Sequence, residues 1–147
     1  MPKIERSTTI NASAEKAYNY LIDVSKHAEW GAHNLEVTRV GDGAIGVGTK
    51  FETVGHQFGA QPGTVTITEL VPNQKIVYES DGKVGHFRHQ FTIADTGDGA
   101  VRVSKGFDLL QVRSLPLKVL GPIVRRFVAP KGLDGDLARI KAKLETA

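Results

Sequence analysis

Residues 133–144 of this chain, LDGDLARIKAKL, decide its fold. Their apolar positions recur at steps of four, three and four residues: Leu133, Leu137, Ile140 and Leu144. That spacing puts all of them on one face of an α-helix, so we expect a helix from about Leu133 to Glu145. A long amphipathic helix needs an apolar surface to cover, and a β-sheet built from the preceding residues would provide it.

The segment before this helix contains prolines that an unbroken helix does not tolerate. We expect a first helical piece that starts near Leu117 or Pro122 and ends at Ala129. The residues 130–132, Pro-Lys-Gly, interrupt the apolar phase, and we predict a kink there.

Most of the chain upstream of residue 111 reads as strands joined by short turns. Ranges with β-branched residues and two-residue alternation are 4–10, 35–40, 49–54, 64–70, 75–80, 86–94 and 100–110. Two short helices are expected after the first strand, one over about 14–21 and one that starts at Asp23 or Ser25 and ends near Trp30. Because parallel strands need long crossovers, short turns between strands predict an antiparallel meander.

Composition limits the class of protein. The length of 147 residues predicts a single domain over 1–147, and the absence of cysteine excludes disulfides and thiolate chemistry. No apolar run is long enough for a membrane span and the first residues do not form a signal peptide, so we expect a cytoplasmic protein without stable membrane insertion. The net charge is +3, and residues 111–147 hold eight Lys/Arg against three Asp/Glu. Spread basic residues with few aromatics do not indicate nucleic-acid binding.

Two patterns point to sites that the context excludes. Residues 41–46, GDGAIG, match a dinucleotide-binding fingerprint, but a strand follows where that site needs a helix. We therefore interpret this segment as a hairpin loop. His86 and His89 are three residues apart, which on a strand sends them to opposite faces, and we predict no metal site.

The order of elements and several short motifs resemble the START/Bet v 1-like superfamily, and within it the polyketide cyclase/dehydrase and lipid-transport family. The resemblance rests on INASAEKA at 10–17, YLID at 20–23 followed by Trp30, GVGT at 46–49, ELVP at 69–72 and the run 137–145. It implies an α+β helix-grip fold, in which a curved antiparallel sheet of about seven strands wraps around the long C-terminal helix. Two short helices follow the first strand.

Such a sheet leaves a cavity between itself and the helix, mostly apolar with a few polar groups, which suits a small hydrophobic ligand. The candidate ligand-binding residues are Trp30, Phe51, Phe58, Val65, Ile67, Tyr78, Phe87, His89, Phe91, Val103, Lys105, Phe107 and Phe127.

His89 is the most informative of these residues because it shares a strand face with Phe87, Phe91 and Ile93. On the cavity wall it can donate to a ligand oxygen or act as an acid or base near neutral pH, with Tyr78 as its helper. The alternative is a half-buried histidine bonded to a neighbouring hydroxyl or backbone group. An inward Lys105 would need an anionic partner, and we expect it to extend to the rim instead.

Three functions remain open at this point. The first is binding or transport of a lipid, polyketide or aromatic compound without a cofactor, by a monomer or homodimer. The second is a polyketide cyclase/aromatase or dehydrase-like enzyme that uses His89 and Tyr78 in the same cavity. The third is an interaction protein that presents the basic C-terminal segment, including Arg125 and Arg126, to a partner or a membrane surface.

Overall fold

The computed structural model describes residues 4–29, 35–55, 61–83, 85–113, 119, 122–123 and 129–146. Its elements in chain order are β1 (Ile4–Ile10), α1 (Ala14–Leu21), the 3-10 helix η1 (Val24–Glu29), β2 (Leu35–Val40), β3 (Lys50–Gly55), β4 (Gln61–Val71), β5 (Lys75–Gly82), β6 (Gly85–Asp95), β7 (Val101–Val112) and α3 (Ala129–Thr146). These bounds confirm the predicted strands to within a few residues at each end.

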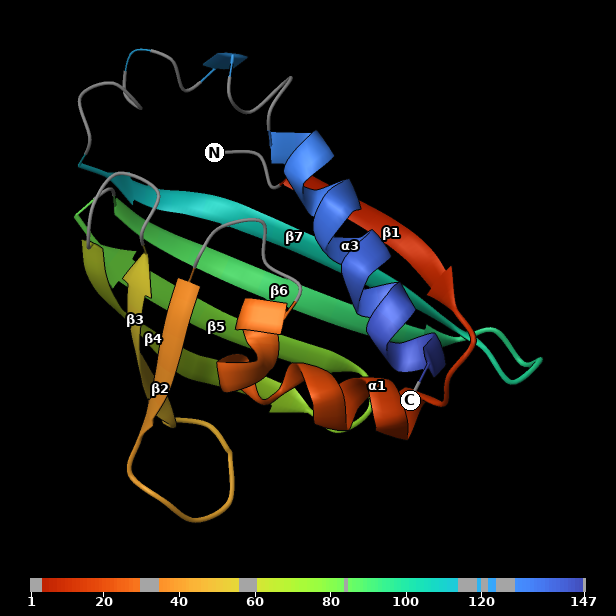
Figure 1. Ribbon diagram of the computed structural model, residues 1–147. Helices are drawn as coiled ribbons and strands as arrows, with labels where there is room; N and C mark the ends of the chain where they lie inside the picture. Colours follow the sequence, from red (N-terminus) through yellow and green to blue (C-terminus); the bar gives the residue numbers. More distant parts are fainter. Residues whose placement is uncertain are drawn as a thin grey trace.

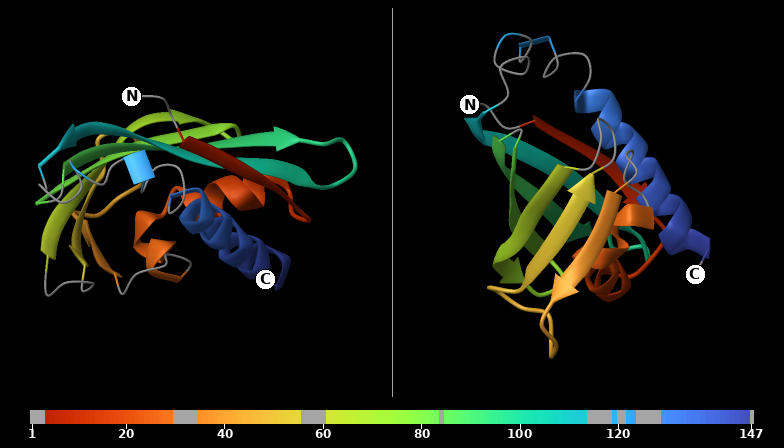
Figure 2. Two further views of the ribbon diagram at one scale, coloured as in Figure 1. Left: turned by 90° about the horizontal axis from the view of Figure 1, so that it is seen from above. Right: turned by 60° about the vertical axis from the view of Figure 1, so that its left-hand side comes forward.

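The strands form a single antiparallel sheet with the order β1-β7-β6-β5-β4-β3-β2. β1 pairs with β7 rather than with β2, so β1 and β2 are the two edge strands of the sheet. The segment with the two short helices connects these edges. The sheet is curved, and α1 and α3 lie on the same side of it (Figures 1 and 2). This α+β architecture is the helix-grip fold that the sequence predicted.

Two irregularities bend the sheet. The register shifts between Ile67 and Glu69 on β4 opposite β5, and again between His86 and Phe87 on β6 opposite β7. An extra residue on one strand bends it and reverses which side chains face inward. The strict alternation predicted for residues 64–70 therefore ends at Ile67, and Leu70 rather than Glu69 packs against the core.

Helix α1 begins where the sequence predicted. Ser13 is its N-cap, and the Ser13 side chain accepts a hydrogen bond from the Lys16 backbone N–H at 3.1 Å. The helix buries Ala17, Tyr18 and Leu21, which lie on one face. This face packs toward β5 and β6 and closes one end of the core.

Helix α3 starts earlier than expected. It runs without interruption from Ala129, so Pro130 lies in its first turn, where a missing backbone N–H costs no helical hydrogen bond. The predicted kink at 130–132 is therefore wrong. The preceding helical piece falls mostly outside the described residues. Its described residues before Ala129 are 119 and 122–123, and these are helical. The predicted apolar face of α3 is confirmed, because its four members are at most 2% exposed: Leu133, Leu137, Ile140 and Leu144.

The C-terminal end of α3 is fastened to the end of β1 and to α1. Lys141 Nζ donates to the Thr9 carbonyl at 2.6 Å, and the Asn11 backbone N–H donates to Glu145 Oε2 at 2.9 Å. Lys16 Nζ of α1 donates to the Leu144 carbonyl at 3.0 Å. α3 is thereby held along β1 at one edge of the sheet, as the views of Figure 2 show.

The loop that resembles a dinucleotide fingerprint joins β2 to β3. Gly41 and Gly43 have positive φ angles of 84° and 93°, and the chain then continues into β3. No helix begins there, which confirms its interpretation as a hairpin loop. Within the described residues, no helix is both long and apolar enough to cross a membrane.

Candidate functional site

The face of the sheet that packs against α1 and α3, called the covered face below, carries the predicted site residues. Cross-strand register arranges its side chains in rows across the strands. From the β6–β7 turn outward, these rows are Ile93 and Val103; then Ile76, Phe91 and Lys105; then Ile67, Tyr78, His89 and Phe107; then Phe51, Val65, Ser80, Phe87 and Leu109.

Burial changes along these rows. The first two rows are fully buried against the helices, as are Phe51, Val65 and Ile67 on β3 and β4. In the last two rows, the side chains of β6 and β7 are only half-buried: Phe87, His89, Phe107 and Leu109. The core therefore fills one end of the covered face and leaves aromatic surface partly uncovered toward the other end.

Tyr78 and His89 form a stacked pair at the boundary between these two ends. Their ring centroids lie 4.8 Å apart and their planes differ by 13°. His89 Nε2 lies 2.9 Å from Ser80 Oγ, so this histidine does bond to a neighbouring hydroxyl, as the alternative interpretation proposed. Burial, and secondarily the charge of Asp136, raises the pKa of the Tyr78 phenol well above its usual range. The Tyr78 phenol therefore keeps its proton at neutral pH, where its hydroxyl can donate a hydrogen bond.

Lys105 lies on the covered face and does not extend to the rim, so that prediction is wrong. The residue is 5% exposed, and its Nζ lies 3.6 Å from Asp136 Oδ2 on α3. The Nζ also lies 5.7 Å from the centroid of the Phe91 ring. Burial lowers the pKa of the Lys105 ammonium, and the Asp136 carboxylate offsets part of that shift. The anionic partner comes from α3, and no spacing in the sequence links it to Lys105.

Arg39 is a covered-face residue that sequence reasoning missed. It lies directly opposite Phe51, which is fully buried, and it is more buried than its neighbours Thr38 and Val40. Its Nε atom is buried and has no hydrogen-bond partner among the described residues. The alternation of Val37 and Arg39 in the 35–40 strand was the available signal.

His86 and His89 do point to opposite faces. His86 Nε2 lies 2.8 Å from Glu79 Oε1 on the outer face, away from the Tyr78–His89 stack. In the part of the chain that is described, no three His, Cys, Asp or Glu residues gather at metal-binding distance.

Comparison with known proteins identifies the family. Residues 1–145 match the model of the family described as polyketide cyclase/dehydrase and lipid transport. The chain belongs to this family. No curated protein matches the sequence at a significant level.

Several solved structures share the fold of this family member at low sequence identity. A START superfamily protein from Mycobacterium smegmatis has a TM-score of 0.79 and 16% identity, over 98% of this chain and 97% of that one. The Zhui aromatase/cyclase from Streptomyces sp. R1128 has a TM-score of 0.73 and 15% identity, over 98% and 93%. The Aha1 dimer from Colwellia psychrerythraea has a TM-score of 0.64 and 17% identity, over 99% and 97%.

The structure brings together most of the predicted site residues of this family member on the covered face. Phe51, Val65, Ile67, Phe91 and Val103 are buried components of the core there. Their role toward a ligand stays a prediction. Trp30, Phe58 and Phe127 lie outside the described residues, as do Arg125 and Arg126.

Two basic residues of α3 already have partners within the chain. Arg139 donates to Asp136 Oδ1 at 2.8 Å, and Lys141 Nζ lies 2.8 Å from Glu145 Oε2. These contacts use part of the positive charge that an interaction surface on this helix would need.

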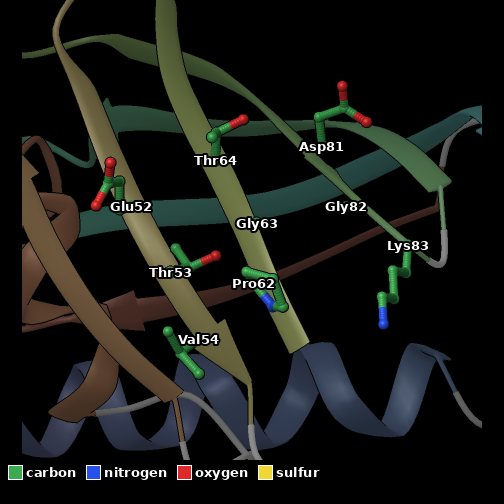
Figure 3. Close-up of a pocket in the computed structure, with 9 residues that line it drawn as sticks. All are labelled: Glu52, Thr53, Val54, Pro62, Gly63, Thr64, Asp81, Gly82 and Lys83. Atoms are coloured by element: carbon green, nitrogen blue, oxygen red, sulfur yellow. The ribbon is translucent and has the colours of Figure 1, made fainter. Parts of the chain in front are cut away.

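A separate open hollow lies where the end of β3, the start of β4 and the end of β5 come near one another (Figure 3). Its volume is about 710 Å³, and its lining is Glu52, Thr53, Val54, Pro62, Gly63, Thr64, Asp81, Gly82 and Lys83. Most of these side chains are exposed, and none belongs to the predicted site. The half-buried aromatic end of the covered face is therefore the stronger candidate for a hydrophobic ligand.

Proposed function

We propose that this protein binds a small hydrophobic molecule, such as a lipid, a polyketide or another aromatic compound, between the covered face and α3. The supporting observation is the loss of burial along β6 and β7, where Phe87, His89 and Phe107 stay half-buried beside a filled core. A ligand that covers these rings removes apolar surface from water, which is worth about 25 cal/mol per Å². Membership of a family described by lipid transport agrees with this function.

Native mass spectrometry of the purified protein tests this proposal. We expect one apolar molecule per chain, identified after extraction, and the same spectrum reports whether the protein is a monomer or a homodimer. Protein emptied by extraction should then bind Nile red, an uncharged dye that fluoresces in apolar sites. Protein that is empty as purified and also fails to bind the dye would reject the proposal.

Two variants on one strand locate the dye. Phe107→Ala removes a half-buried ring from the covered face, whereas Leu110→Ala changes a side chain that is 50% exposed. We expect Phe107→Ala to weaken Nile red binding severalfold and Leu110→Ala to leave it unchanged. Equal effects of both variants would place the dye elsewhere.

A second candidate is acid–base catalysis on a polyketide in the same place, and the Tyr78–His89–Ser80 cluster favours it. The raised pKa keeps Tyr78 protonated, so its hydroxyl can donate a hydrogen bond to a substrate carbonyl. His89 then takes a proton from the carbon beside that carbonyl, the C–H electron pair forms the enolate, and His89 returns the proton in a later step. The family description includes cyclases and dehydrases. Incubation with a linear poly-β-ketone thioester tests this function. His89→Phe should abolish cyclised product while the substrate still displaces Nile red, and unchanged product would exclude His89 as the acid or base.

A further inference from the structure

Ser80 and His89 form a hydrogen-bonded pair on two neighbouring strands in the middle of the sheet. Ser80 on β5 and His89 on β6 both lie on the covered face, and the Ser80 Oγ is 2.9 Å from His89 Nε2. Both residues are half-buried, so each keeps part of its surface accessible to a molecule in the proposed ligand site. A serine hydroxyl within hydrogen-bond reach of an imidazole is the arrangement that activates serine as a nucleophile.

The imidazole of this pair is oriented by the rings around it. The Tyr78 ring stacks on it with centroids 4.8 Å apart, and the centroids of the Phe107 and Phe87 rings lie 6.2 Å and 6.5 Å from it. Contacts on several sides thus hold the base toward the hydroxyl, a role that a carboxylate has in many other serine nucleophile sites. Because β5 pairs with β4 and with β6 at Ser80, both groups stand on rigid elements.

From this geometry we infer a further activity: Ser80 is a nucleophile, with His89 as its general base, that cleaves hydrophobic acyl groups from a good leaving group. The inference rests on the proposed function, because the acyl chain lies on the same half-buried rings as the proposed ligand. It differs from the proposed enolate chemistry, in which His89 acts on a carbon atom and no bond to the protein forms. In the reacting form the imidazole carries its proton on Nδ1, so that Nε2 accepts from the Ser80 hydroxyl.

The reaction proceeds in two balanced steps. In the first, Ser80 Oγ attacks the acyl carbon, its proton moves to His89 Nε2, and the π electrons of the carbonyl move to its oxygen. When the carbonyl re-forms, the bond to the leaving phenolate or thiolate breaks, and His89 gives that group the proton. In the second, water attacks the acyl-serine, His89 takes the proton of the water and returns it to Ser80 Oγ, and the carboxylic acid is released.

The surrounding sheet limits the class of substrate. Ser80 lies on a strand that is paired on both sides, which engages the neighbouring backbone N–H groups in the sheet and withholds them from a developing oxyanion. A donor to that oxyanion typically contributes about 10²–10³-fold in rate. Substrates whose leaving group is already stable depend least on such donors, so we expect aryl esters and thioesters of long acyl chains.

Labelling of the wild-type protein tests the nucleophile directly. Decyl fluorophosphonate forms a stable bond to a reactive serine as fluoride leaves, and peptide mapping by mass spectrometry should place one label per chain on Ser80. The p-nitrophenyl ester of decanoic acid should be cleaved at least about tenfold faster than that of acetic acid, because the longer chain covers more of the half-buried rings. Absence of the label from Ser80, or equal rates for the two esters, would overturn the inference.

Variants show whether the two residues act as a unit. Ser80→Ala and His89→Phe should each slow cleavage of the decanoyl ester about 10²-fold, and the double variant should be no slower than either single one. Ser104→Ala and His86→Phe are matched controls with wild-type rates, because both side chains lie on the outer face. An unchanged rate in Ser80→Ala, or single effects that multiply in the double variant, would overturn the inference. Circular dichroism checks that each variant is folded, and the labelling of the wild type stands without any variant.

The outcomes separate this inference from the proposed function. Absence of Nile red binding in the wild type rejects the proposed function, and with it the site on which the acyl chain lies. Dye binding without a label on Ser80 rejects the inference and leaves hydrophobic binding intact. A label on Ser80 that Nile red prevents supports both, because the dye and the acyl chain then occupy the same rings.

Discussion

The ring of Tyr78 on β5 stacks on the imidazole of His89 on β6, with centroids 4.8 Å apart and planes 13° apart. The stack lies between the filled core and the half-buried end of the covered face, with Phe91 6.4 Å from Tyr78 and Phe107 6.2 Å from His89. One face of a fixed polar ring is therefore presented among apolar side chains. If the proposed function holds, we expect this arrangement to orient the ligand and to supply a hydrogen bond without a movement of the backbone.

Substitutions at His89 separate its ring from its nitrogens. His89→Phe keeps an aromatic ring against Tyr78, whereas His89→Ala removes the ring contact. We expect Nile red affinity to stay within about twofold for His89→Phe and to fall severalfold for His89→Ala, since an aromatic pair contributes about 0.5–1.5 kcal/mol. Fluorescence titration measures this. Equal losses in both variants would show that the nitrogens, not the ring, carry the contact.

Removal of the two partners of the Lys105–Asp136 bridge should have unequal effects on stability. Asp136→Asn leaves a buried ammonium without its carboxylate, and we expect it to reduce the free energy of unfolding by about 3–5 kcal/mol. Lys105→Met should cost less, because Asp136 keeps Arg139.

Urea unfolding at neutral pH measures both variants. The loss in Asp136→Asn should grow as the pH falls from about 10 towards neutrality, because the unfolded chain is protonated at Lys105 there, while burial without the carboxylate disfavours the ammonium in the folded variant. A larger loss in Lys105→Met would contradict this account of the bridge.

Alkaline stability should depend on Tyr78. Its folded-state pKa is raised by burial, so its contribution is complete below about pH 10, the usual tyrosine value, and is lost as the pH rises above it. The unfolded chain ionises there while the folded chain does not. Above pH 10, the free energy of unfolding of the wild type should therefore fall relative to that of Tyr78→Phe, by about 1.4 kcal/mol per pH unit. Urea unfolding at several pH values measures both proteins. A difference in free energy of unfolding that stays constant between pH 8 and about pH 11 would contradict this prediction.

Gly85 is predicted to be irreplaceable for a packing reason. A Cβ at this position would overlap the backbone carbonyl oxygen of Gln111 on β7, which cannot move without breaking the strand pair. We expect Gly85→Ala to reduce the free energy of unfolding by about 1–3 kcal/mol. Gly46→Ala is the matched control, because its Cβ would meet no atom within 4 Å. Thermal or urea unfolding compares the two variants. Equal stabilities would show that the β7 backbone shifts to accommodate the added Cβ.

Local periodicity was enough to predict the elements of this fold. The four-three-four spacing in residues 133–144 identifies the buried face of α3, and two-residue alternation identifies the strands. The opposite directions of His86 and His89 follow from the same alternation and are confirmed. These features depend on neighbouring residues along the chain, whose geometry is set by helix and strand repeats.

Only the tertiary structure decided which charges meet and which residues form the candidate site. Asp136 lies opposite Lys105 because α3 crosses the covered face next to β7, and Arg39 joins that face through its register with Phe51. Pro130 is accepted because the helix starts one residue before it. The shift at Ile67 cannot be read from alternation, since a bulge depends on the paired strand. Contacts between distant segments follow from register and sheet curvature, which the whole set of strands determines together.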